Sequence, residues 1–147
     1  EQQLVKALPK LVKASSSSAL QTAFQDHLDD TREHVNRLEK IFVDLEVKGS
    51  KKCKAMEGLI AEGQEAIKDK KEEPIHDAEL IAAAQRVEHY EIAGYGTVRT
   101  YAEKLGLDDA AELLQQTLDE EGEADKKFTA ISESLLASQS ALETSEF

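Results

Sequence analysis

Acidic side chains interrupt the apolar stripes of three long segments that have helical periodicity. These segments span Ala19–Val47, Ala78–Leu105 and Asp109–Leu136. Each stripe is apolar at both ends and turns polar near its midpoint, at Asp30 and His34, at Glu88 and Glu91, and at Glu121 and Asp125. An unpaired buried carboxylate costs several kcal/mol or more, so a group of them at one level requires compensating positive charge. Two metal ions inside a helix bundle would supply that charge.

The spacing of these residues suits metal ligands. Asp30 and His34 lie four residues apart, on one face of a helix, and Glu121 and Asp125 have the same spacing. The Glu-x-x-His pairing of many di-iron bundles is absent, because Thr31 stands three residues before His34. A ligand shell made mostly of oxygen suits iron, manganese or magnesium better than zinc.

Several candidates also have an interpretation without metal. His34 could lie at the flank of its stripe and bond to the helix backbone or to Asp30. Glu91 could be a solvated neighbour of Glu88 instead of a further ligand. Tyr95 could carry an electron beside a redox metal, although core packing with its hydroxyl on a carboxylate is the favoured interpretation.

Helical spacing also decides between two neighbouring glutamates. Glu120 and Glu121 are alternatives for one role, and the apolar stripe of the last segment favours Glu121. His27 shares a face with Asp30 and His34, but we favour a capping or surface position for it.

Composition predicts an all-α protein. Aromatic residues make up 5% of the 147 residues, tryptophan is absent and there are two prolines. The net charge of −12 argues against nucleic acid and anionic membranes as partners. The single cysteine, Cys53, excludes an intramolecular disulfide, and no apolar run is long enough to span a membrane. We therefore expect a soluble cytoplasmic protein.

Connection lengths predict the topology. Short turns at Ser15–Ser18 and Gly106–Asp108 favour two antiparallel helical hairpins. The link from Gly49 to His76 is long enough to travel the height of a bundle, and its apolar residues predict one short helix. We expect residues 1–147 to form one ferritin-like four-helix domain, with up-down-down-up order, a long crossover and a short extra helix.

The first helix, Glu1–Ala14, is only about half as long as the other three. We expect that it begins upstream of residue 1. Its midpoint would then fall near Glu1, which places a fourth carboxylate level with the other three. Glu1 could otherwise be a frayed terminal residue.

Four stretches resemble the YciE/YciF family of bacterial ferritin-like stress proteins. They are EQQLVKALPK (1–10), HLDDT with HV (27–31 and 34–35), AMEGLI (55–60) and LIAAAQRVEHYEIAGYGT (80–97). The resemblance covers essentially the whole chain and implies a rubrerythrin-like bundle, a dinuclear centre that holds iron, and a homodimer. Asp30 stands where family members usually carry glutamate.

These observations lead to one functional hypothesis and one alternative. We expect two iron ions, or alternatively two manganese ions, bound by Glu1, Asp30, His34, Glu88, Glu91, Glu121 and Asp125. Such a centre would serve the stress response by oxidising Fe(II) or by reducing O₂ or peroxide. The alternative is a non-catalytic structural or protein-binding module in which the metal is structural or absent.

Overall fold

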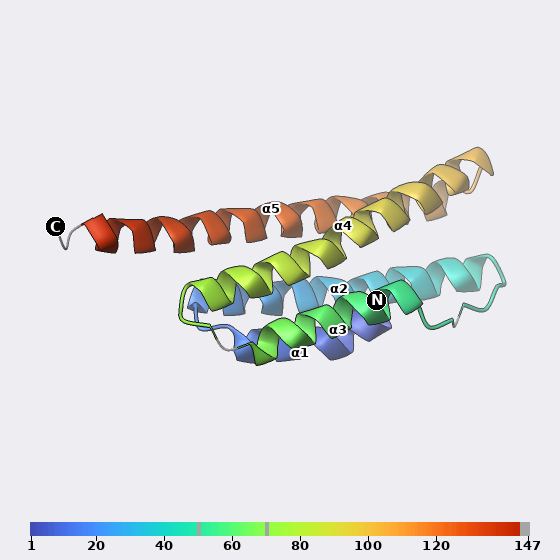
Figure 1. Cartoon of the computed structure of the whole chain (residues 1–147). Coiled ribbons are helices and arrows are strands. Elements are labelled where there is room, and N and C mark those ends of the chain that lie inside the picture. Colours follow the sequence, from blue (N-terminus) through green and yellow to red (C-terminus); the bar gives the residue numbers. More distant parts are fainter. Residues whose placement is uncertain (50, 70, 145–147) are drawn as a thin grey trace.

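Five helices make up the chain (Figure 1). The computed structural model describes residues 1–49, 51–69 and 71–144, apart from the side chains of 138–144. The helices are α1 (Gln2–Ala14), α2 (Ser18–Asp44), α3 (Lys54–Lys68), α4 (Ile75–Lys104) and α5 (Asp108–Thr144). No strand occurs in these ranges, so the predicted all-α class is confirmed. None of the helices within them is long and apolar enough to cross a membrane.

The helices follow the predicted up-down-down-up order. In Figure 1, α1 and α2 form one antiparallel pair and α4 and α5 form the other, and α2 and α4 run in the same direction. The chain returns between them through α3, which packs against both α1 and α4. The crossover and the short extra helix predicted from the sequence are therefore confirmed.

Two helices end in the same backbone motif. At the end of α4, Gly106 has a positive φ of 70°, and the Leu107 amide donates to the Ala102 carbonyl at 2.9 Å. At the end of α2, Glu46 takes this role with φ 54°. The prediction that this helix reaches Val47 was wrong, because the left-handed residue Glu46 turns the chain out of the helix after Asp44.

The apolar core is divided into two clusters along the bundle. The larger cluster contains Phe24, Leu80 and Phe128 and lies toward the ends of the helices where α2 and α4 begin. The smaller cluster contains Ile41 and Leu114 and lies toward the opposite ends. The midpoints of α2, α4 and α5 fall between the clusters, where the sequence stripes turn polar.

A buried carboxylate joins the two hairpins at one end of the bundle. Asp77, in the first turn of α4, is 1% exposed and accepts hydrogen bonds from the backbone amides of Ser16 and Ser17 at 2.9 and 2.7 Å. Ser17 is the N-cap of α2, and its hydroxyl accepts from the Leu20 amide. Asp77 therefore sets the position of α4 relative to the start of α2.

We expect Asp77→Ala to lower the free energy of unfolding by about 3 kcal/mol, because two charge-assisted hydrogen bonds are lost. Urea unfolding followed by circular dichroism would measure the change. Asp29→Ala is the control, since Asp29 is 61% exposed and its partners Arg32 and Gln25 are exposed as well. It should change stability by less than about 1 kcal/mol. Equal effects of the two substitutions would contradict the linking role of Asp77.

Candidate metal centre

Six titratable side chains converge between the two apolar clusters. They come from the N-cap of α1 and from α2, α4 and α5, and they are Glu1, His27, His34, Glu88, Glu91 and Glu121. They form two groups, His27–Glu88–Glu91–Glu121 and Glu1–His34–Glu121, each with one potential ligand atom per residue within 4.8 Å of the others. Glu121 belongs to both groups. We call these six residues the central cluster.

The closest contacts in the central cluster join histidine nitrogens to carboxylate oxygens. His27 Nε2 lies 3.1 Å from Glu88 Oε1 and 3.9 Å from Glu121 Oε2. His34 Nδ1 lies 3.0 Å from Glu121 Oε1 and 3.7 Å from Glu1 Oε1. Both histidines therefore direct a ring nitrogen toward Glu121, from positions two turns apart on α2.

The central cluster leaves many buried polar atoms without hydrogen bonds. These are both ring nitrogens of His27, both carboxylate oxygens of Glu121, and one atom each of Glu1, His34, Glu88 and Glu91. Among the described residues, only Glu79 and Arg99 contribute further atoms of this kind. Buried polar groups in proteins are almost always paired, so unpaired oxygen and nitrogen acceptors concentrated here fit a site for cations.

The electrostatics of the carboxylates fit the same interpretation. Burial, assisted by neighbouring negative charges, raises the pKa of Glu88 to about 7. Burial and the charge of Glu88 likewise raise the pKa of Glu121 to about 7, and burial with the surrounding carboxylates holds the pKa of Glu91 well above its usual range. Without a cation, these side chains therefore ionise only at a higher pH than an exposed glutamate does.

His34 is held in a defined orientation by groups outside the central cluster. Its Nε2 lies 2.8 Å from Glu120 Oε2, and Arg37 donates to both oxygens of Glu120. This contact leaves Nδ1 directed at Glu1 and Glu121. Burial alone would lower the pKa of His34, but the carboxylates of Glu1 and Glu121 outweigh it and raise the pKa to about 10.

Tyr95 closes the central cluster on the side of the smaller apolar cluster. Its hydroxyl donates a hydrogen bond to Glu1 Oε1, and its ring meets that of His34 edge-on, with centroids 6.3 Å apart. Tyr95 is 8% exposed. The structure thus has the favoured arrangement of a packed tyrosine whose hydroxyl reaches a carboxylate, and Glu1 is a buried partner instead of a frayed end.

Two predicted ligands lie outside the central cluster. Asp30 is exposed, because the inward face of α2 carries His27, Thr31 and His34, and Asp30 falls on its flank. Asp125 accepts a hydrogen bond from Gln85 Nε2 at 2.9 Å and lies 3.2 Å from Nε2 of the exposed His89. Their spacing of four residues from His34 and Glu121 led to the prediction that both face the core. In the structure neither does, so the candidate set no longer contains Asp30 and Asp125.

His27 is the residue that sequence reasoning missed. A capping or surface position was favoured for it, but it is 3% exposed, and its ring packs edge-on against Phe128. Its separation of seven residues from His34 is two full turns, so both side chains lie on one face of α2. That seven-residue histidine spacing was the available signal.

Glu120 and Glu121 take different positions. Glu121 is 0% exposed and belongs to the central cluster, whereas Glu120 is 36% exposed and pairs with Arg37 and His34. The structure therefore separates the two competing candidates into an inward carboxylate and one that contacts the outer nitrogen of His34.

We expect the metal-free protein to lose stability as the pH rises from 4.5 to about 7. Over this interval the unfolded chain ionises Glu88 and Glu121, while the folded state keeps them protonated. Each carboxyl contributes up to about 3 kcal/mol to this loss. Urea unfolding across this pH interval, in the presence of a chelator, would measure it.

The control compares one buried and one exposed glutamate of α5. Glu121→Gln should make the dependence of stability on pH shallower, because it removes one titrating group, and Glu112→Gln should leave it unchanged because Glu112 is exposed. An unchanged dependence in Glu121→Gln would contradict the protonation described here.

The chain is similar to known proteins in sequence and in fold. Protein YciF of Escherichia coli (strain K12) is 48% identical over 132 residues, which cover 88% of this chain and 79% of that protein. The crystal structure of the E. coli stress protein YciF matches with a TM-score of 0.89 and 44% identity, covering 92% of this chain and 87% of that one. YcfI from Rhodopseudomonas palustris, a suggested structural protein, matches with a TM-score of 0.83 and 40% identity, covering 87% of this chain and 82% of that one.

A family model also matches nearly the full length of the sequence. It covers residues 1–141 and is described as a domain of unknown function, DUF892. Together with the identity to YciF, this match shows that the chain belongs to the DUF892 family.

Proposed function

We propose that this protein binds two metal ions in the central cluster and that Glu121 would contribute to holding both. The observation that carries the proposal is the sharing of Glu121 between the two groups of potential ligands. Both of its oxygens are buried and, although each lies near a histidine nitrogen, neither has a well-aligned hydrogen bond. A carboxylate with two free oxygens is the ligand type that joins two ions.

The remaining residues divide between the two ions. His27, Glu88 and Glu91 would hold one ion together with Glu121, and Glu1 and His34 would hold the other. Two imidazoles among four carboxylates favour iron or manganese over zinc, which prefers more nitrogen and sulfur ligands. We propose iron, with manganese as the alternative.

Two bound iron ions would supply two electrons, one from each ion, to a single oxidant molecule. We propose oxidation of two Fe(II) to two Fe(III), with one peroxide and two protons yielding two waters, or with one O₂ and two protons yielding one peroxide. Neighbouring side chains would orient two of the proposed ligands, His34 and Glu1, for this electron transfer. Glu120 holds His34 Nε2, and the Tyr95 hydroxyl holds Glu1 Oε1.

The second candidate is a structural function, because the similar protein from R. palustris is described as a suggested structural protein. In that case the ions would only neutralise the buried carboxylates and join the four helices, without turnover. The protein would then bind iron and gain stability, but it would not speed the reaction of Fe(II) with an oxidant.

We expect about two metal ions per chain in the protein reconstituted with Fe(II) without oxygen, and fewer than half of one in Glu121→Ala. Metal analysis after gel filtration would measure both values. Asp30→Ala is the matched control, since Asp30 was a sequence candidate but lies exposed, and it should retain both ions. Loss of metal from Asp30→Ala together with retention in Glu121→Ala would contradict the assignment.

Turnover separates the catalytic function from the structural one. We expect the protein to oxidise Fe(II) with peroxide or O₂ at least about tenfold faster than free iron at the same concentration, since paired ions deliver two electrons together. Stopped-flow absorbance of Fe(III) formation would measure the rate. A rate equal to that of free iron, with two ions bound, would support the structural function instead.

A further inference from the structure

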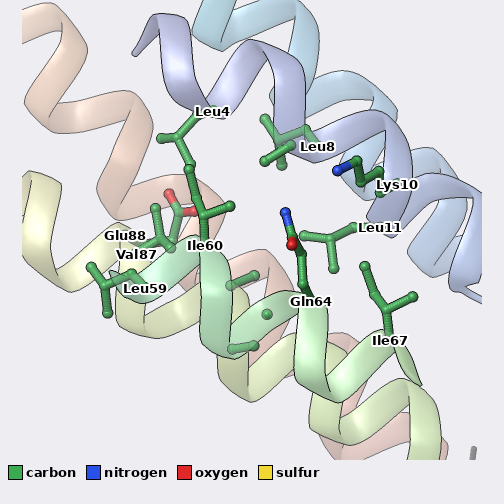
Figure 2. Close-up of a pocket in the computed structure, with 14 residues that line it drawn as sticks. Leu4, Leu8, Lys10, Leu11, Leu59, Ile60, Gln64, Ile67, Val87 and Glu88 are labelled. Carbon is green, nitrogen blue, oxygen red and sulfur yellow. The ribbon is translucent and has the colours of Figure 1, made fainter. Parts of the chain in front are cut away.

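An apolar pocket lies between α1, α3 and α4, beside the central cluster (Figure 2). Its walls are mainly aliphatic and include Leu4, Leu8, Leu11, Ile60, Ile67 and Val87. Three polar or charged side chains also line it, namely Lys10, Gln64 and Glu88. The pocket is therefore a separate space from the central cluster but shares Glu88 with it.

Glu88 connects the two spaces. In Figure 2 its carboxylate lies at the end of the pocket near Leu4 and Ile60, while Gln64 and Ile67 lie at the other end. Glu88 Oε1 is 3.1 Å from His27 Nε2, and Oε2 has no hydrogen-bond partner. A molecule at this end of the pocket would be next to a proposed metal ligand.

The size of the pocket restricts its occupant. About 30 Å³ is open to the centre of a water-sized molecule. A single water needs roughly 10–15 Å³ on this measure, so the inner part of the pocket has room for a very few small molecules. The pocket is also partly open to solvent, which gives such molecules a way in. Small cavities with aliphatic walls tend to stay dry and to accept uncharged apolar guests.

Gly63 of α3 lines the pocket without a conformational reason for being glycine. It lies inside a regular helix, where glycine costs about 1 kcal/mol relative to alanine. A Cβ atom built on Gly63 would meet nothing within 4 Å. The α3 wall of the pocket therefore carries no side chain at this position, and a larger residue there would meet no steric barrier at its Cβ.

We propose that this pocket binds dioxygen and delivers it to the Glu88 side of the metal centre. Dioxygen is small, uncharged and apolar, which matches the mainly aliphatic walls. Peroxide needs several hydrogen-bond partners, and only Lys10, Gln64 and Glu88 among the lining residues have polar side chains that could supply them. The inference rests on the proposed function and names O₂ as an oxidant of that site. It assigns α3, the crossover helix, a part in the reaction.

Xenon tests the pocket independently of metal and of activity, because it occupies cavities that accept small apolar molecules. We expect xenon in the pocket of metal-free crystals under pressure, and none in Gly63→Leu, whose side chain would fill the space. Gly58→Leu is the matched control, since Gly58 also lies on α3 with nothing within 4 Å of a built Cβ, but it does not line the pocket. Ordered water in the pocket, or its failure to bind xenon, would overturn the inference and leave the metal proposal intact.

The second measurement compares the rates of Fe(II) oxidation by O₂ and by peroxide. In a single oxidation of two bound Fe(II), Gly63→Leu should raise the O₂ concentration that gives half of the maximal rate by about tenfold, while the rate with peroxide stays unchanged. Gly58→Leu should change neither value. An equal loss with both oxidants, or no loss with O₂, would overturn the assignment of the pocket to dioxygen. Absence of bound iron in the unmodified protein would instead refute the proposed function, and the xenon result would still stand.

Discussion

The burial of four glutamates in one layer of a helix bundle is the constraint that shapes the rest of this protein. Glu88, Glu91 and Glu121 are each at most 6% exposed, and the side chain of Glu1 is 5% exposed. All four lie between two apolar clusters that shield them from water. Ionised carboxylates so placed repel one another and have lost their hydration. Two histidines offset part of this cost, but they leave the oxygens of Glu121 without hydrogen bonds. The metal ions that we propose would offset the rest of this cost.

Much of this layer can be predicted from the sequence, because helical periodicity places residues on faces. Glu88 and Glu121 interrupt otherwise apolar stripes, and both are among the most buried side chains. Asp30 and Asp125 also fit a spacing of four, but each falls on the flank of its helix. Periodicity cannot resolve such flank positions, because they depend on the rotation of each helix about its axis, which packing against neighbouring helices determines.

His27 shows that the burial of a histidine is also difficult to predict from the sequence. Its spacing of seven from His34 is visible in the sequence, but a histidine on a helix is compatible with both a buried and an exposed position. Packing against Phe128, which is about one hundred residues away in the chain, buries it. The topology of the bundle was easier to predict than the burial of His27, because the lengths of the connections limit the directions in which consecutive helices can run. The role of α3 beside α1 and α4 could not be predicted, since its length alone does not say which face it covers.

Anomalous X-ray scattering from a crystal of the iron-loaded protein would test the central claim most directly. Data collected on both sides of the iron absorption edge should show two peaks between α1, α2, α4 and α5. One should be bound by His27, Glu88 and Glu91, the other by Glu1 and His34, with Glu121 between them. Peaks only at surface carboxylates such as Asp30, or no peak in a crystal whose buried glutamates keep the same positions, would contradict the account.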